Sequence, residues 1–134
     1  MVRLLQDYFH VDDIEKVSGI FNGTSNYILT EMEQKQISFE VALRQAQDLG
    51  FAEADPTNDI AGYDARYKLV ILTYLITGIW LAPEQNTLEG IGQLEPADFA
   101  YASRMDRRVK LIGYFKREDQ KLKAFVLPLM VPRD

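Results

Sequence analysis

The 134-residue chain has no cysteine, only one histidine and no glycine-rich phosphate turn. Without cysteine, neither disulfides nor thiolate metal sites can form. Because His10 is the only imidazole, a serine nucleophile activated by a histidine base is a poor explanation for any activity. Gly90 and Gly92 begin a dinucleotide-binding pattern, but Glu95 stands where its third glycine belongs. We therefore do not expect the chain to bind a nucleotide by itself.

The composition is that of one globular domain. Apolar residues make up 47% and aromatic residues 11% of the chain, enough to bury a core. A net charge of -5 argues against a nucleic-acid partner. The longest apolar run, Leu69 to Leu81, is interrupted by Gly78 and is too short to span a bilayer. No apolar signal segment follows Met1. We expect a soluble, cytoplasmic protein with no membrane partner.

Hydrophobic periodicity and capping residues predict short helices and strands that do not alternate regularly. This order favours an α+β fold, with helices packed on one face of a small mixed β-sheet and a single domain over residues 1–134. Lys116 to Lys121 is expected to be a polar turn, and the helix ending at Thr77 to be buried on most sides. Helices are expected at Val2–Phe9, at Thr24–Gln36 with Thr24 or Ser25 as N-cap, from Ser38 to Gly50, at Asp59–Thr77 and from Pro96; strands are expected at Ile14–Phe21, Leu88–Ile91, Val109–Phe115 and Leu122–Val131.

Four carboxylates and one lysine crowd a turn that leads into the longest predicted helix: Glu53, Asp55, Asp59, Asp64 and Lys68. The carboxylates repel one another, and a cationic ligand group, a lysine partner or both would offset that repulsion. Their spacing does not match a calcium-binding EF-hand loop, and Pro56 interrupts it. We therefore expect no metal site.

Asp64 and Lys68 are four residues apart, so they share one face of the helix and can pair. An ordinary surface ion pair, worth about 0.3–0.5 kcal/mol, is one explanation. The apolar helix after Lys68 and the carboxylates before it favour a functional role. Neighbouring negative charge keeps the lysine protonated, which suits a proton donor better than a base.

The segment from Gly19 to Tyr27 is a turn followed by a helix start. Its exposed amide N–H groups and hydroxyls could hold a substrate carboxylate. An ordinary helix cap with two glycines for geometry explains the same pattern equally well.

Three segments resemble the catalytic region of homoserine dehydrogenases. They are Gly19–Thr30 (GIFNGTSNYILT), the helix that begins Ser38-Phe-Glu, and Leu49–Leu69 (LGFAEADPTNDIAGYDARYKL). The likeness extends from about Val11 to Pro132. This family interconverts L-aspartate 4-semialdehyde and L-homoserine with NADP or NAD, in the pathway to threonine and methionine.

The resemblance implies a role for each matching residue. It implies that Glu53 binds the substrate ammonium, that Asp59 and Asp64 order the site, and that Lys68 donates the proton. The turn lies where the substrate and the nicotinamide meet: Gly19 and Thr24 are assigned to the substrate, and Asn22 and Gly23 to the cofactor. The resemblance also implies a homodimer.

Two departures from the family pattern stand out. Phe51 occupies a position where the family usually has tyrosine. The family's nucleotide-binding domain, with a second active-site lysine, has no counterpart in this sequence. We therefore expect a catalytic-domain fragment, truncated at both ends, that binds no cofactor tightly and is inactive in isolation. The alternative is a dimerisation or amino-acid-binding module without catalysis.

Overall fold

The computed structural model describes residues 14–118 and 121–133, so the helix expected at Val2–Phe9 lies outside the described residues. A mixed four-stranded sheet has the strand order β1-β3-β4-β2. β1 and β4 run antiparallel to β3, whereas β2 runs parallel to β4. The elements in chain order are β1 (Lys16–Gly19), α2 (Gly23–Lys35), α3 (Phe39–Asp48), α4 (Thr57–Ile60), α5 (Tyr63–Thr77), the 3₁₀ turn η2 (Pro83–Gln85), β2 (Thr87–Leu88), α6 (Pro96–Arg104), β3 (Arg107–Glu118) and β4 (Lys121–Pro132).

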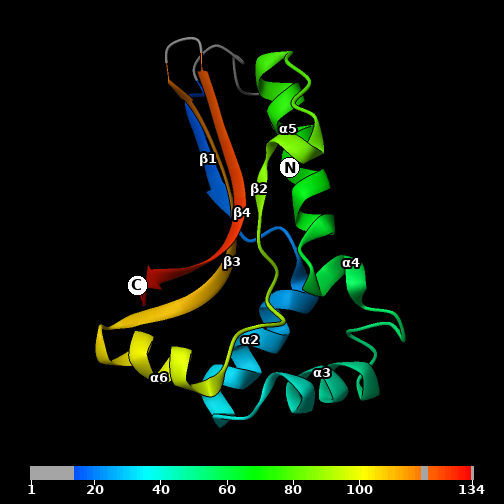
Figure 1. The fold of residues 1–134 in the computed structure, drawn as a ribbon, viewed down its shortest axis with the longest axis vertical. Helices are drawn as coiled ribbons and strands as arrows, with labels where there is room; N and C mark the ends of the chain where they lie inside the picture. The colour runs from blue at the N-terminus through cyan, green and yellow to red at the C-terminus, as the bar shows by residue number, and fades with distance from the viewer. Residues whose placement is uncertain (1–13, 119–120, 134) are drawn as a thin grey trace.

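The main helices lie on one side of this sheet. Figure 1 shows α2, α4 and α5 together on one face, with α6 at the curved end of β3. Alternate strand residues Val109, Leu111 and Phe115 are buried in the core together with Leu29 and Leu69 from the helices. The predicted α+β class, with helices packed on one sheet face, is confirmed.

The predicted ends of α3 and the predicted start of α6 are confirmed. Ser38 is the N-cap of α3, and its side chain accepts a hydrogen bond from the N–H of Val41. Gly50 follows that helix with a φ of 77°, and α6 begins at Pro96 as predicted. The predicted strand at Leu88–Ile91 shortens to β2 because the N–H of Ile91 donates instead to the carbonyl of Ile60, at 2.8 Å.

The prediction of one helix over Asp59–Thr77 was wrong. Two helices, α4 and α5, meet at Gly62, whose φ is 82°. The positive φ favours glycine here; a Cβ at this position would also lie 2.9 Å from Cδ1 of Leu88, the end of a side chain that can shift.

The expectation that the long helix is buried on most sides was also wrong for the described chain. Leu69, Val70 and Ile76 of α5 are buried, but Ile71 is 50% exposed. Tyr67 and Tyr74, at helical spacing from Ile71, are exposed on the same face. Within the described residues, every helix falls short of the length or apolar content that a bilayer span requires.

The predicted polar turn from Lys116 to Lys121 was too long. β3 continues to Glu118, which pairs with Lys121 at the start of β4. Glu118 also forms ion pairs with Lys116 at 2.8 Å and with Lys123 at 3.3 Å. These charged residues therefore belong to the ends of the two strands, where they pair with one another.

Candidate active site

Asn22 is the centre of the site. It is the N-cap of α2, and its Oδ1 accepts a hydrogen bond from the N–H of Ser25 at 2.7 Å. Its Nδ2 donates to Oδ1 of Asp59 at 2.6 Å and to Oδ2 of Asp64 at 2.9 Å. One amide that is only 6% exposed therefore joins the start of α2 to both α4 and α5.

The predicted N-cap, Thr24 or Ser25, was wrong. The hydroxyl of Ser25 donates to the carbonyl of Asp59 at 2.7 Å, and that of Thr24 to the carbonyl of Phe51 at 2.8 Å. Both hydroxyls thus connect α2 to the segment that carries the four carboxylates, while Asn22 caps the helix. Asparagine is among the best N-cap residues, so this signal was present in the sequence beside the turn-forming Asn-Gly pair.

Lys68 and Asp64 pair as their spacing predicted, with Nζ 2.6 Å from Oδ2. The lysine Nζ also donates to the carbonyl of Phe21 at 3.1 Å. No sequence signal pointed to this carbonyl, because the contact spans 47 positions. The ammonium group therefore lies beside the loop that leads into α2, with 52% of the lysine side chain exposed to solvent.

The electrostatics of the site keep Asp64 ionised. Burial acts to raise the pKa of Asp64, but hydrogen bonds from Lys68 and Asn22, with the charge of Lys68, outweigh it and hold the pKa below its ordinary value.

The four carboxylates do not form one cluster as the sequence suggested. Asp59 and Asp64 meet at Asn22, whereas Asp55 accepts hydrogen bonds from the N–H and the hydroxyl of Thr57 at the start of α4. Those bonds hold the pKa of Asp55 below its ordinary value. Among the described residues, no group of three or more histidine, aspartate or glutamate side chains is placed to hold a metal ion.

Glu53 remains available to a ligand. Its side chain is exposed and makes no hydrogen bond or ion pair with the described residues. Only its backbone is held, through a hydrogen bond from Gln47 Nε2 to the Glu53 carbonyl at 3.1 Å. Beside it, Phe51 stacks on Tyr27 with the ring centroids 4.6 Å apart, so the tyrosine-to-phenylalanine departure keeps an aromatic ring here.

The loop in front of Lys68 has an open surface. A Cβ placed on Gly19 or Gly23 would meet no atom within 4 Å. The predicted residues thus lie close together in sequence: Gly19 ends β1, Asn22 is in the loop that follows, and Gly23 and Thr24 begin α2. The contacts above bring Asp59, Asp64 and Lys68 to this region.

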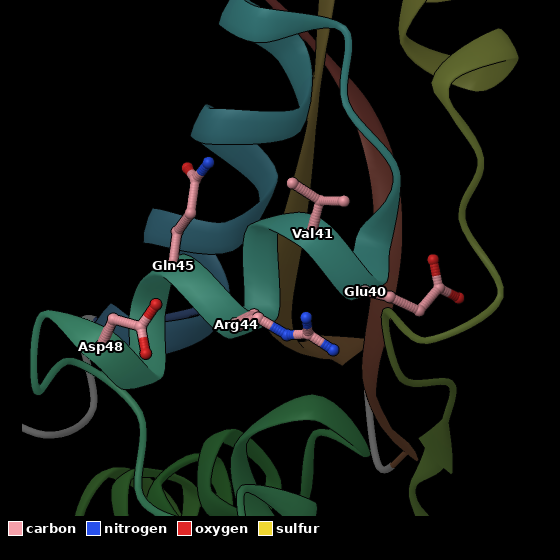
Figure 2. Close-up of a pocket in the computed structure, with 5 residues that line it drawn as sticks. All are labelled: Glu40, Val41, Arg44, Gln45 and Asp48. Atoms are coloured by element: carbon pink, nitrogen blue, oxygen red, sulfur yellow. The ribbon is translucent and has the colours of Figure 1, made fainter.

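Two surface hollows contain none of the predicted site residues. One, of about 300 Å³, is lined by α3 alone; in Figure 2 its Glu40, Arg44 and Asp48 side chains point in different directions and do not converge. The other, of about 450 Å³, lies between the start of α3 at Ser38 and the loop around Glu95 before α6.

The fold and these contacts define an α+β domain in which a lysine and two carboxylates gather around an asparagine-capped helix start. The homoserine dehydrogenase family model matches residues 1–134, and the chain belongs to this family.

Individual relatives agree with this assignment. The chain is 39% identical to homoserine dehydrogenase from Bacillus subtilis, over 98% of this chain and 30% of that protein. A crystal structure of a homoserine dehydrogenase from Thiobacillus denitrificans matches with a TM-score of 0.92 and 42% identity, over 98% of this chain and 30% of that one. A hyperthermophilic archaeal homoserine dehydrogenase mutant in complex with NADPH matches with a TM-score of 0.76 and 25% identity, over 100% and 37% of the two chains. The chain thus spans about a third of the length of the relatives it matches.

Proposed function

We propose that the chain is the substrate-binding and proton-donating region of a homoserine dehydrogenase that interconverts L-aspartate 4-semialdehyde and L-homoserine. The observation that carries this proposal is the position of the Lys68 ammonium, which is held by Asp64 and the Phe21 carbonyl beside an open glycine loop. This reaction belongs to threonine and methionine biosynthesis, and we place the enzyme in the cytoplasm.

Lys68 is the proton donor in the reducing direction. As a hydride reaches the aldehyde carbon, negative charge develops on the carbonyl oxygen, and Lys68 Nζ transfers a proton to give the alcohol. Asp64 orients the lysine, since its Oδ2 accepts a hydrogen bond from Nζ at 2.6 Å. In the oxidative direction the neutral amine takes the hydroxyl proton back.

Glu53 and Asp59 have different tasks. The free carboxylate of Glu53 pairs with the substrate ammonium, a charge-assisted contact. Asp59 accepts from Asn22 and so fixes the loop, while Gly19 and Thr24 border the substrate.

NADP or NAD supplies and accepts the hydride. Asn22 and Gly23 border the nicotinamide, where the open space at Gly23 fits the close approach of a flat ring. Since the described residues include no glycine-rich phosphate turn, the phosphates are held by a nucleotide-binding domain outside residues 14–133. The NADPH complex of the archaeal relative supports this cofactor class. On this view residues 1–134 are one domain of a longer protein.

The enzyme acts as a homodimer through the sheet face opposite the buried residues of β3 and β4. Because strand side chains alternate, Ile112, Tyr114, Phe125, Leu127 and Leu129 lie opposite the core face of β3 and β4. Tyr114 and Phe125 stack there at 4.7 Å. A contiguous apolar sheet face is typical of an interface, and a two-fold axis pairs it with its own copy.

Two measurements test the function. Calorimetry with L-homoserine should show binding to this chain that Glu53→Gln weakens and Glu40→Gln, a control at an exposed residue of α3, does not. The chain alone should not reduce NADP⁺ with homoserine, and the enzyme that contains it with a nucleotide-binding domain should. Homoserine binding without turnover in that complete enzyme would favour the amino-acid-binding module instead, and reduction by the chain alone would refute the missing-domain hypothesis.

A further inference from the structure

Lys110 of β3 makes long-range contacts that the proposed chemistry does not use. Its Nζ donates to Oδ1 of Asn26 at 2.8 Å and to Oγ1 of Thr30 at 3.0 Å, both on α2. Burial, which is the largest effect, lowers the pKa of Lys110; Glu33 opposes this shift and Arg108 adds to it. A half-buried ammonium that is bonded to two neutral oxygens is a costly arrangement for a surface strand.

These acceptors belong to one polar side of α2. Asn22, Asn26 and Thr30 are four residues apart, so they lie along one face of the helix. Further along this face, Glu33 lies 3.6 Å from Arg108 and 3.4 Å from Arg133. Cations from β3 and from the residue after β4 therefore bind α2 along the same face that ends at the active-site asparagine.

The edge of β3 is open where Lys110 contacts α2. β1 pairs with β3 only between Gly113 and Lys116, so among the described strands the stretch Arg107–Ile112 has no neighbour on that side. Lys110 lies in this open stretch and reaches α2, where a further strand would otherwise pair.

The two hydrogen bonds of Asn22 tolerate only a small displacement of α2. Its Nδ2 spans Asp59 and Asp64 at 2.6 and 2.9 Å, and a shift of about 1 Å would break one or both bonds. The buried residues of α2, such as Leu29 and Met32, make apolar contacts that are not directional. The hydrogen bonds from Lys110 to Asn26 and Thr30 are directional, as are those of Thr24 and Ser25, and so constrain the position of the helix along its axis.

We propose that Lys110 is a positioning residue, which holds α2 against the open edge of β3 at the position where Asn22 bridges Asp59 and Asp64. This role rests on the proposed function only for its effect on catalysis; the geometric effect can be measured without turnover.

The test compares Lys110→Met, which keeps the length but loses the charge, with Lys123→Met as the control. Lys123 is a 69% exposed lysine of β4 whose ion pair is with Glu118. A ¹³C NMR titration of Asp64 responds to its hydrogen bonds from Lys68 and Asn22, and Lys68 is the same in every variant compared. We expect the pKa of Asp64 to rise toward its ordinary value in Lys110→Met and to stay low in Lys123→Met and in the charge-preserving Lys110→Arg.

A lower melting temperature with an unchanged Asp64 titration would reduce Lys110 to a structural role and overturn the proposal. If Lys110→Met does not fold, Thr30→Val removes one acceptor with little change in volume and should move the Asp64 titration in the same direction; no movement would also overturn it. In the complete enzyme, Lys110→Met should lower kcat by up to about a hundredfold. If the Asp64 shift occurs without loss of activity, the positioning role stands and the proposed chemistry fails.

Discussion

At the scale of single residues, the site contains two kinds of side chain: exposed charged groups that can reach a substrate, and buried polar groups that hold the structure. Lys68 and Glu53 present exposed charged groups, whereas Asn22 and Ser25 are buried and make bonds within the protein. Substitutions in the first pair should change kinetics, and those in the second pair stability as well.

Replacement of Lys68 by alanine should lower kcat by about 10²–10⁴ in the complete enzyme, with a smaller effect on KM. The ammonium is needed most when charge develops on the carbonyl oxygen. Lys35 offers a matched control, because it also pairs with a carboxylate four residues away, Glu31, and is also 52% exposed. Equal kcat values for Lys68→Ala and Lys35→Ala would make the Lys68 pair an ordinary surface pair.

Replacement of Glu53 by glutamine should raise the KM for homoserine and leave the melting temperature unchanged, because no described residue depends on this carboxylate. Asp55→Asn should lower the melting temperature and leave the KM unchanged, because Asp55 accepts two hydrogen bonds from Thr57. Steady-state kinetics and thermal denaturation of both variants measure the contrast. An unchanged KM with a lower melting temperature in Glu53→Gln would exclude substrate binding.

Asp64 should make stability depend on acid pH. Its pKa is lower in the folded than in the unfolded chain, so the unfolded chain binds more protons in this range and stability rises with pH. The stabilisation is present above the ordinary aspartate pKa and disappears as the pH falls through the lowered value. Melting curves of the native chain and Asp64→Asn should therefore differ most near neutral pH and converge in acid. A constant difference across this range would contradict the assignment.

At the scale of elements, the break between α4 and α5 determines the site. Asp59 and Asp64 would be fixed on one straight helix without it, and the turn at Gly62 lets both face Asn22. The sequence contained Gly62, but the apolar pattern continues across it, so a single helix was predicted.

Gly62→Ala should destabilise the fold by about 1–2 kcal/mol from the left-handed backbone alone. The added Cβ would lie 2.9 Å from Leu88 Cδ1, and this side-chain end can shift to accept it. Gly92→Ala is the control, because Gly92 has no positive φ and its Cβ would meet no atom within 4 Å. Urea denaturation of both variants measures the difference. Equal free energies of unfolding for the two variants would show that the break between α4 and α5 does not require glycine at position 62.

At the scale of the whole molecule, the described residues include an apolar sheet face around Leu127 and an apolar α5 face around Ile71. The proposed dimer uses the sheet face. Sedimentation should show that Leu127→Glu shifts the chain toward monomer, while Ile71→Glu leaves it dimeric. The opposite result would assign the interface to α5, and a monomeric native chain would contradict the dimer.

Features that depend on near neighbours could be predicted from the sequence. The Ser38 cap, the Pro96 start and the Asp64–Lys68 pair each involve residues within four positions, so local geometry decides them. The family motif added the roles of Glu53 and Lys68 as expectations.

Contacts between distant groups depend on the packing of the whole fold. Asn22 reaches Asp59 and Asp64 across 37 and 42 positions, and Lys110 reaches Asn26 across 84. No periodicity encodes such contacts, because they depend on how core burial offsets the entropy of closing long loops. The same packing decides which face of α5 stays exposed, since burial depends on what lies opposite a side chain as well as on its own hydrophobicity.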